Sequence, residues 1–97
     1  MPTYVILAKW TTQGIQKIKE SPARLDAARK AFEGAGVKMK DFYMVMGQYD
    51  MVLVGEAADD AVFARAVISI AGGGNIQTET LKAFTEDEYR AIVLSLP

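Results

Sequence analysis

The stretch Phe42–Gly55 constrains the fold more than any other part of the chain, because two apolar runs flank a short break. The break is Gly47–Asp50. Glycine takes positive φ without steric cost and aspartate closes turns with its side chain, so this pattern predicts a β-hairpin. The run Met51–Val54 is apolar at every position, which is typical of a central strand that is covered on both faces.

The other strands can be placed from the same kind of pattern. Thr3–Trp10 is apolar in both alternating sets, so it is predicted as the second central strand. Val37–Met46 and Asn75–Phe84 are predicted as edge strands, and the first of them begins with charged residues, as edges often do. Strict alternation in the Val37–Met46 strand predicts one face with Phe42, Met44 and Met46 and the other with Met39, Tyr43 and Val45.

The first long helix is marked by a start signal and by glycines at its end. Ser21 followed by Pro22 predicts a start at which Ser21 is the cap, and Gly34 and Gly36 mark the end. Arg24 falls in the first turn and is expected on the exposed face. A positive charge is unfavourable at this end of the helix dipole, which indicates another use for Arg24.

Two later helices have acidic start signals. Asp59 and Asp60 open a helix that Gly72–Gly74 ends. These glycines are interpreted as a turn rather than a phosphate loop, because no strand precedes them and no Lys-Ser/Thr follows. Thr85 is predicted to form a capping box and to open the last helix. The side chains of the last helix that are expected to point inward are Tyr89, Ile92, Val93 and Leu96.

The resulting order, βαββαβ plus a C-terminal helix, predicts a ferredoxin-like α+β fold with a four-stranded antiparallel sheet. Residues 1–97 are expected to form a single domain. The two main helices would cover one face of the sheet and leave the other face bare, although the strands are apolar on both faces. A bare apolar face of this size is typical of an interface, so we expect a homodimer or higher oligomer that packs sheet to sheet as a dimeric α/β barrel.

Composition excludes several classes of function. The net charge is −1 with no basic run, so nucleic acid is not an expected partner. The chain has no cysteine and no histidine, so we expect no redox cofactor and no metal site of the Cys/His kind. No signal peptide is evident, and no apolar run approaches the roughly 18 residues of a membrane-spanning helix. We therefore expect a cytoplasmic protein that does not bind membranes.

Along nearly its whole length the chain resembles the GYD family of small bacterial and archaeal proteins. The matching pieces are Lys9–Thr11, Gln13–Ile15, Ser21-Pro22, Phe42-Tyr43, Met46–Asp50, Thr78–Leu81 and Ala83–Thr85. Each piece is weakly specific by itself, but their order and spacing together are specific. The resemblance implies a dimeric α/β-barrel fold and implies little chemistry.

A second, more distant likeness covers roughly residues 42–85. Here the chain resembles the amino-acid-sensing domain of the Lrp/AsnC transcription regulators, at Gly47, Tyr49, Asp50, Asp60, Phe63, Gly74–Ile76 and Thr78–Thr80. That domain binds small effectors near subunit contacts with its Gly–Tyr–Asp turn region. The chain has no helix-turn-helix module, so DNA binding is not implied.

The candidate ligand-binding residues are Trp10, Tyr43, Gly47, Tyr49, Asp50, Thr78 and Thr80. Asp50 either closes the hairpin or accepts a hydrogen bond from an amine or hydroxyl ligand. Tyr49 either packs in a core or interface or contacts a ligand. The aromatic residues Trp10 and Tyr43 either fill the core or line a pocket between sheet and helices. The threonines either face solvent or line a polar pocket. No catalytic residue stands out.

Three hypotheses for function are compatible with this pattern. The leading one is a homo-oligomeric small-molecule-binding protein without a redox cofactor. The alternative is a cofactor-free monooxygenase or isomerase that acts on an apolar aromatic substrate. Since the commonest general base, histidine, is absent, Asp50, Tyr43 and Tyr49 would have to serve instead. The third is a purely structural or accessory subunit.

Overall fold

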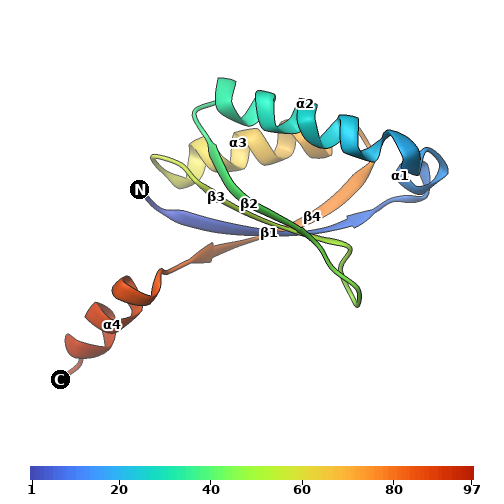
Figure 1. Ribbon diagram of the computed structural model, residues 1–97. Coiled ribbons are helices and arrows are strands. Elements are labelled where there is room, and N and C mark those ends of the chain that lie inside the picture. The colour runs from blue at the N-terminus through green and yellow to red at the C-terminus, as the bar shows by residue number, and fades with distance from the viewer.

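The computed structural model describes residues 1–97 and shows helices on one side of a four-stranded sheet (Figure 1). The chain order confirms the predicted βαββαβ pattern followed by a helix. The elements are β1 (Thr3–Trp10), α1 (Thr12–Gln16), the 3-10 helix η1 (Ile18–Glu20), α2 (Ser21–Gly34), β2 (Lys38–Met44), β3 (Met51–Glu56), α3 (Asp60–Ala71), β4 (Ile76–Ala83) and α4 (Glu86–Leu94).

The strand order in the sheet is β2-β3-β1-β4, and every neighbouring pair is antiparallel. The two strands predicted to be central, β1 and β3, are central, and β2 and β4 are the edges. Val5 of β1 lies opposite Val54 on one side and Leu81 on the other. This order confirms the interpretation of the two most apolar runs as the inner strands.

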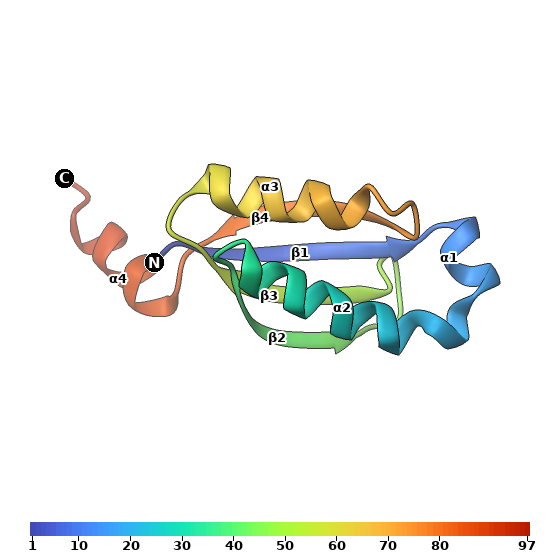
Figure 2. The ribbon, with the colours of Figure 1, turned by 90° about the horizontal axis from the view of Figure 1, so that it is seen from above.

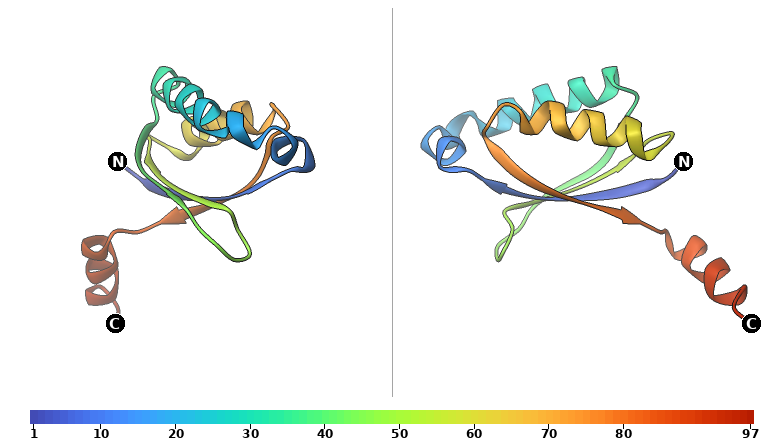
Figure 3. Two further views of the ribbon diagram at one scale, coloured as in Figure 1. Left: turned by 45° about the vertical axis from the view of Figure 1, so that its right-hand side comes forward. Right: turned by 180° about the vertical axis from the view of Figure 1, so that it is seen from behind.

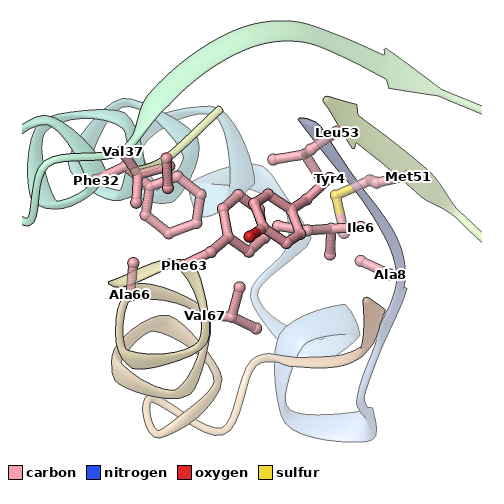
Figure 4. Close-up of a cluster of buried hydrophobic side chains, with 11 residues drawn as sticks. Tyr4, Ile6, Ala8, Phe32, Val37, Met51, Leu53, Phe63, Ala66 and Val67 are labelled. Carbon is pink, nitrogen blue, oxygen red and sulfur yellow. The ribbon is translucent and has the colours of Figure 1, made fainter. Parts of the chain in front are cut away.

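One face of the sheet, which we call the covered face, packs against α2 and α3. These helices lie side by side over the sheet and run roughly along the strands (Figure 2). From β1 the covered face presents Tyr4, Ile6 and Ala8, all buried. The ring of Phe63 from α3 stacks on Tyr4, with centroids 4.2 Å apart and planes at 18°, at the centre of the buried cluster (Figure 4). Burial of side chains this large is the main stabilising contribution to the fold.

The other face, which we call the open face, has no helix over it (Figures 1 and 3). Its central side chains are Val5, Leu7, Val52 and Val54, and they are only partly buried. The expectation that β1 and β3 are covered on both faces is therefore wrong for a single chain. The physical reason is that the two helices that pack on the sheet, α2 and α3, both lie on the same side of it.

A β-bulge at Lys40 changes which way β2 faces. Met39 lies opposite Gly55, whereas Asp41 lies opposite the adjacent Val54, so one residue of β2 is unmatched. An extra residue reverses the alternation beyond it. Met39 consequently packs against the core together with Phe42, while Tyr43 belongs to the open face. The prediction that Met39 shares a face with Tyr43 is wrong for this reason.

Two predicted helix starts are confirmed and one is not. Asp59 accepts a hydrogen bond from the backbone N–H of Val62 at 2.9 Å, and Thr85 forms the predicted capping box with Glu88. Ser21 is not a cap, because its backbone is already helical and η1 runs directly into α2. A capping side chain needs an extended residue before the helix, and no such residue is present there.

Helix α4 projects away from the rest of the molecule (Figure 3). The side chains that were expected to point inward are exposed, at 59% for Tyr89, 46% for Ile92, 45% for Val93 and 65% for Leu96. That prediction is wrong because α4 continues beyond the end of β4, away from the sheet, so no other element covers its apolar side chains (Figure 3). None of the helices has the length and apolar character that crossing a membrane requires.

Candidate functional site

The loop between β2 and β3 is tied to the end of β1 by Asp50. The backbone N–H of Val45 donates to the Asp50 carbonyl at 2.8 Å, which closes the loop. The Asp50 carboxylate accepts from the backbone N–H of Trp10 at 3.0 Å, and the Asp50 N–H donates to the carbonyl of Ala8 at 2.9 Å. The Asp50 side chain therefore has a structural partner, but this partner lies on β1 rather than within the turn, which the Asp50 backbone carbonyl closes instead.

The tip of this loop extends on the side of the open face, away from the helices (Figures 1 and 3). Gly47 has φ +151°, which side chains rarely adopt, and no other atom lies within 4 Å of where its Cβ would be. The neighbouring Met46 is 95% exposed. Gly47 is thus required by the backbone of the turn, and no close contact surrounds it.

Tyr49 joins the loop to two strands on the side of the open face. Its hydroxyl donates a hydrogen bond to the carboxylate of Glu79 on β4, and this bond raises the pKa of Tyr49 above its ordinary value. The ammonium nitrogen of Lys9 on β1 lies 5.3 Å from the centre of the Tyr49 ring. Tyr43, on β2, is 60% exposed on the open face.

A cavity of about 340 Å³ lies between the covered face and helices α2 and α3. We call it the Trp10 cavity. Its volume falls within the range of small-molecule sites, roughly 300–1,000 Å³. Of its 19 lining residues, 14 are hydrophobic. On the α2 side the lining includes Ala27, Ala28 and Ala31, whose short side chains leave the space unfilled.

The polar lining residues come from the end of the molecule near α1 (Figure 2). Trp10 ends β1, Ser21 begins α2, Ser69 lies in the last turn of α3, and Asn75 directly precedes β4. Thr78 follows along β4 and also lines the cavity. The cavity therefore has an apolar interior and a polar end built from the termini of several elements.

The indole of Trp10 carries an unpaired donor in this region. Its Nε1 is buried and has no hydrogen-bond partner in the chain. Leaving a buried donor unpaired costs about 1–3 kcal/mol, so such a group in a native fold calls for an explanation. Sequence reasoning identified Trp10 as a candidate but gave no reason to single out its ring nitrogen.

Arg24 also lines the Trp10 cavity, and sequence reasoning placed it wrongly on the exposed face. It is partly buried, and its guanidinium donates to the carbonyls of Lys17 at 3.0 Å and Gly14 at 3.1 Å. The segment of α1 and η1 lies beside the start of α2, which explains the burial. The signal in the sequence was the unfavourable position of a positive charge in the first helical turn.

The rim of the cavity at this end is held by bonds between α1 and the turn before β4. The Thr11 N–H donates to the carbonyl of Asn75 at 3.0 Å, and its hydroxyl donates to the carbonyl of Gly74 at 2.6 Å. A Cβ at Gly14 would lie 2.1 Å from the Asn75 carbonyl oxygen, so only glycine fits at this contact. The position of the rim is thus determined by close backbone contacts between Thr11 or Gly14 and the turn at Gly74 and Asn75.

Thr80 lies elsewhere, in a second hollow of about 310 Å³ between α3 and β4. There the Tyr4 hydroxyl donates to the Asp60 carboxylate, and this bond raises the pKa of Tyr4 to about 12. The same bond, together with Lys82 at 3.4 Å, lowers the pKa of Asp60. The seven predicted residues are therefore not brought together. Trp10 and Thr78 share the cavity, Thr80 lines the second hollow, Tyr43 lies on the open face, and Gly47, Tyr49 and Asp50 form the hairpin loop.

Comparison with known proteins identifies relatives along most of the chain. The profile of the family described as "GYD domain" matches residues 4–93. A relative from Thermus thermophilus, named glutamine synthetase and cystathionine beta-lyase binding protein, is 37% identical over 84 residues, which is 86% of this chain and 88% of the relative.

Two solved structures share the fold at low sequence identity. The feast or famine regulatory protein from M. tuberculosis, complexed with L-methionine, has a TM-score of 0.63 and 18% identity over 90% of this chain. The match covers 54% of the regulator, so this chain corresponds to about half of it. A hypothetical protein from Pyrococcus horikoshii has a TM-score of 0.55 and 22% identity, over 89% of this chain and 93% of that protein.

Proposed function

Because the chain belongs to the GYD domain family, whose profile covers nearly all of it, we propose that it is a homo-oligomeric small-molecule-binding protein. The ligand site is the Trp10 cavity. The observation that carries this proposal is a ligand-sized, apolar space in the layer where a small domain normally packs most tightly. The likeness in fold to a regulator complexed with L-methionine agrees with a ligand-binding role.

Self-association is supported by the shape of the open face. The partly buried valines and leucine of β1 and β3 form its apolar centre, and two protruding segments, the β2–β3 loop and α4, extend on the same side at opposite ends (Figures 1 and 3). A second copy laid sheet to sheet would cover the apolar centre and would lie between the two segments. Burial of this face would supply the cover that a single chain lacks.

Binding is better supported than catalysis because the cavity contains no general base. Its lining includes no aspartate, glutamate, lysine or tyrosine. The groups that would have to act as acid or base in an enzyme, Asp50, Tyr43 and Tyr49, all lie outside it. A proton acceptor has to lie within hydrogen-bond reach of the substrate, so none of these is placed for a reaction in this cavity.

The test compares a variant that fills the cavity with one that does not. Ala28 lines the cavity, whereas Ala23 lies on the exposed side of the same helix. A thermal-shift screen of apolar acids, amides, amines, alcohols and amino acids should identify at least one compound that raises the melting temperature of the wild type. Ala28→Leu should abolish that shift and Ala23→Leu should keep it. A ligand that binds equally to both variants would place the site elsewhere.

A second candidate function is binding to enzymes of amino-acid metabolism. It is favoured by the name of the Thermus relative and by the exposed apolar side chains of α4, of which Leu94 is 84% exposed. Glutamine synthetase and cystathionine beta-lyase from the same organism should then form complexes with the protein that gel filtration detects. Leu94→Glu should weaken them, and Asp87→Lys, a charge change in the same helix, should not. If both variants form the complexes as well as the wild type does, α4 is not the contact surface.

A further inference from the structure

We infer that the Trp10 cavity selects an apolar molecule that carries one carboxylate, with the carboxylate at the Arg24 end and the apolar body among the side chains of the covered face. This inference rests on the proposed function, because it names the ligand class of the same cavity. It follows from the charge of the lining, from the state of the Arg24 guanidinium and from the unpaired donor on Trp10.

The lining of the cavity contains a single charged side chain, and that side chain is positive. Arg24 is the only one of the 19 lining residues that is ionised at neutral pH. An anion is attracted into such a space, and a cation finds no charge to compensate its loss of water. The rest of the lining, from Ile6 to Leu53 and Val67, suits a hydrocarbon chain or ring.

The guanidinium of Arg24 is held in place but is not neutralised. It donates to two backbone carbonyls near the C-terminal end of α1 and forms no ion pair with any carboxylate of the chain. A guanidinium has five N–H donors, and the chain pairs only two of them here. A partly buried cation without a counter-ion is costly, and a ligand carboxylate would offset that cost with charge-assisted hydrogen bonds. The two carbonyl contacts fix the orientation of the group before the ligand arrives.

The Nε1 of Trp10 is a second unpaired donor on a residue that lines the cavity. An indole nitrogen can only donate, so its partner has to be an acceptor such as a carboxylate or carbonyl oxygen. The atom has almost no exposed surface, so an acceptor reaches it only with a shift of the indole or of its neighbours. Unpaired polar groups of the lining thus favour acceptors over donors.

The same argument predicts that a free amine on the ligand weakens binding. An ammonium group needs acceptors, preferably charged ones, and the lining offers only the hydroxyls of Ser21, Ser69 and Thr78 and the amide of Asn75. An amino acid should therefore bind more weakly than the same molecule without its α-amino group. This distinguishes the cavity from a site built for amino acids.

The experiment titrates four ligands that share one apolar body: 3-phenylpropionate, 3-phenylpropionamide, 3-phenylpropylamine and phenylalanine. The chain has a single tryptophan, and it lines the cavity, so intrinsic fluorescence reports on binding and calorimetry gives the affinity. We expect 3-phenylpropionate to bind at least about 10-fold more tightly than each of the others, the gain typical of one charge-assisted hydrogen bond.

Two variants locate the carboxylate. Arg24→Gln should weaken 3-phenylpropionate by at least about 10-fold and leave 3-phenylpropionamide unchanged. Arg29→Gln, which removes a positive charge from the exposed side of the same helix, should change neither affinity. If Arg24→Gln unfolds, the salt dependence of the wild type is measured instead. The affinity for 3-phenylpropionate should fall as the salt concentration rises, and the affinity for the uncharged 3-phenylpropionamide should not.

The outcomes separate this inference from the proposed function. Equal or tighter binding of the amide or the amine would leave the cavity as a ligand site and would overturn the selection of carboxylates. Tight binding of 3-phenylpropionate by a folded Arg24→Gln variant would also overturn it. No binding by any of the four ligands would contradict the inference, and the thermal-shift screen would then decide whether the cavity binds other molecules.

Discussion

The two faces of the sheet are made from similar residues and have different environments. On β1, Ile6 of the covered face is 3% exposed, whereas its neighbours Val5 and Leu7 on the open face are only partly buried. The covered face meets α2 and α3, and no helix lies over the open face (Figures 1 and 3). Apolar residues in a strand therefore indicate that a sheet face is buried, but they do not indicate whether a helix of the same chain or another subunit buries it.

The covered face is itself uneven along its length. Near Tyr4 the space is filled by aromatic rings, since Phe63 stacks on Tyr4 and Phe32 lies 6.3 Å from Phe63 (Figure 4). Elsewhere in this layer the α2 residues include three alanines, Ala27, Ala28 and Ala31, and the space remains open as the cavity. Packing stabilises one end of the layer, and the other end is available for a ligand.

The largest expected effect is the loss of the aromatic centre on the covered face. Phe63→Ala should lower the free energy of unfolding by about 3–5 kcal/mol, because it removes a fully buried ring and leaves a void. Ile68→Ala on the same helix changes a side chain that is 70% exposed and should cost less than about 1 kcal/mol. Urea denaturation measures both. Similar costs for the two variants would contradict the packing described here.

The next effect concerns the open face and should appear in association rather than in folding. Val54→Lys should raise the dissociation constant of the oligomer by at least about 100-fold, because an unpaired ammonium would be buried between two sheets. Ala64→Lys, on the exposed side of α3, should leave it unchanged. Sedimentation equilibrium gives both values. A wild type that sediments as a monomer of 10.6 kDa at micromolar concentration would refute the proposed self-association.

A smaller effect is expected at the link between the hairpin loop and β1. Asp50→Ala removes the acceptor for the Trp10 N–H and should destabilise the chain by about 1–3 kcal/mol. Asp50→Asn keeps an acceptor oxygen and should cost about 1 kcal/mol or less. Chemical denaturation of the two variants distinguishes the hydrogen bond from the charge. If Asp50→Asn is as costly as Asp50→Ala, the charge rather than the acceptor is what matters.

The smallest expected effect is the pH dependence of the Tyr4–Asp60 hydrogen bond at the edge of the covered face. The bond lowers the pKa of Asp60 from 3.8, so its contribution to stability is present above that pH and is lost as the pH falls further. The bond raises the pKa of Tyr4 from 10.0 to about 12, so the contribution is complete below pH 10 and is lost as the pH rises toward 12.

Asp60→Asn should therefore flatten the stability profile at both ends of the pH range. Asp26→Asn, which changes an exposed carboxylate on α2, should keep the wild-type profile. Denaturant midpoints between pH 3 and pH 11 measure the difference. Identical profiles for the wild type and Asp60→Asn would show that the bond makes no pH-dependent contribution to stability.

The sequence by itself determined the order of the elements, the hairpin and the two central strands. These features depend on local rules, since alternation, capping residues and glycines act over a few residues. The helix starts at Asp59 and Thr85 followed the same rules and were placed correctly. Of the candidate site, sequence reasoning found Trp10 and Thr78, because an aromatic strand end and a polar position in an apolar strand are visible in the pattern.

Only the tertiary structure decided the rest. The bulge at Lys40 turned Met39 toward the core, the fold of α1 and η1 partly buried Arg24, and α4 continued beyond β4, away from the sheet. The cavity brings together residues from separate elements, among them Trp10 of β1, Ala28 of α2 and Thr78 of β4. Each of these depends on segments that are distant in the chain, and no local pattern records which distant side chain will lie opposite.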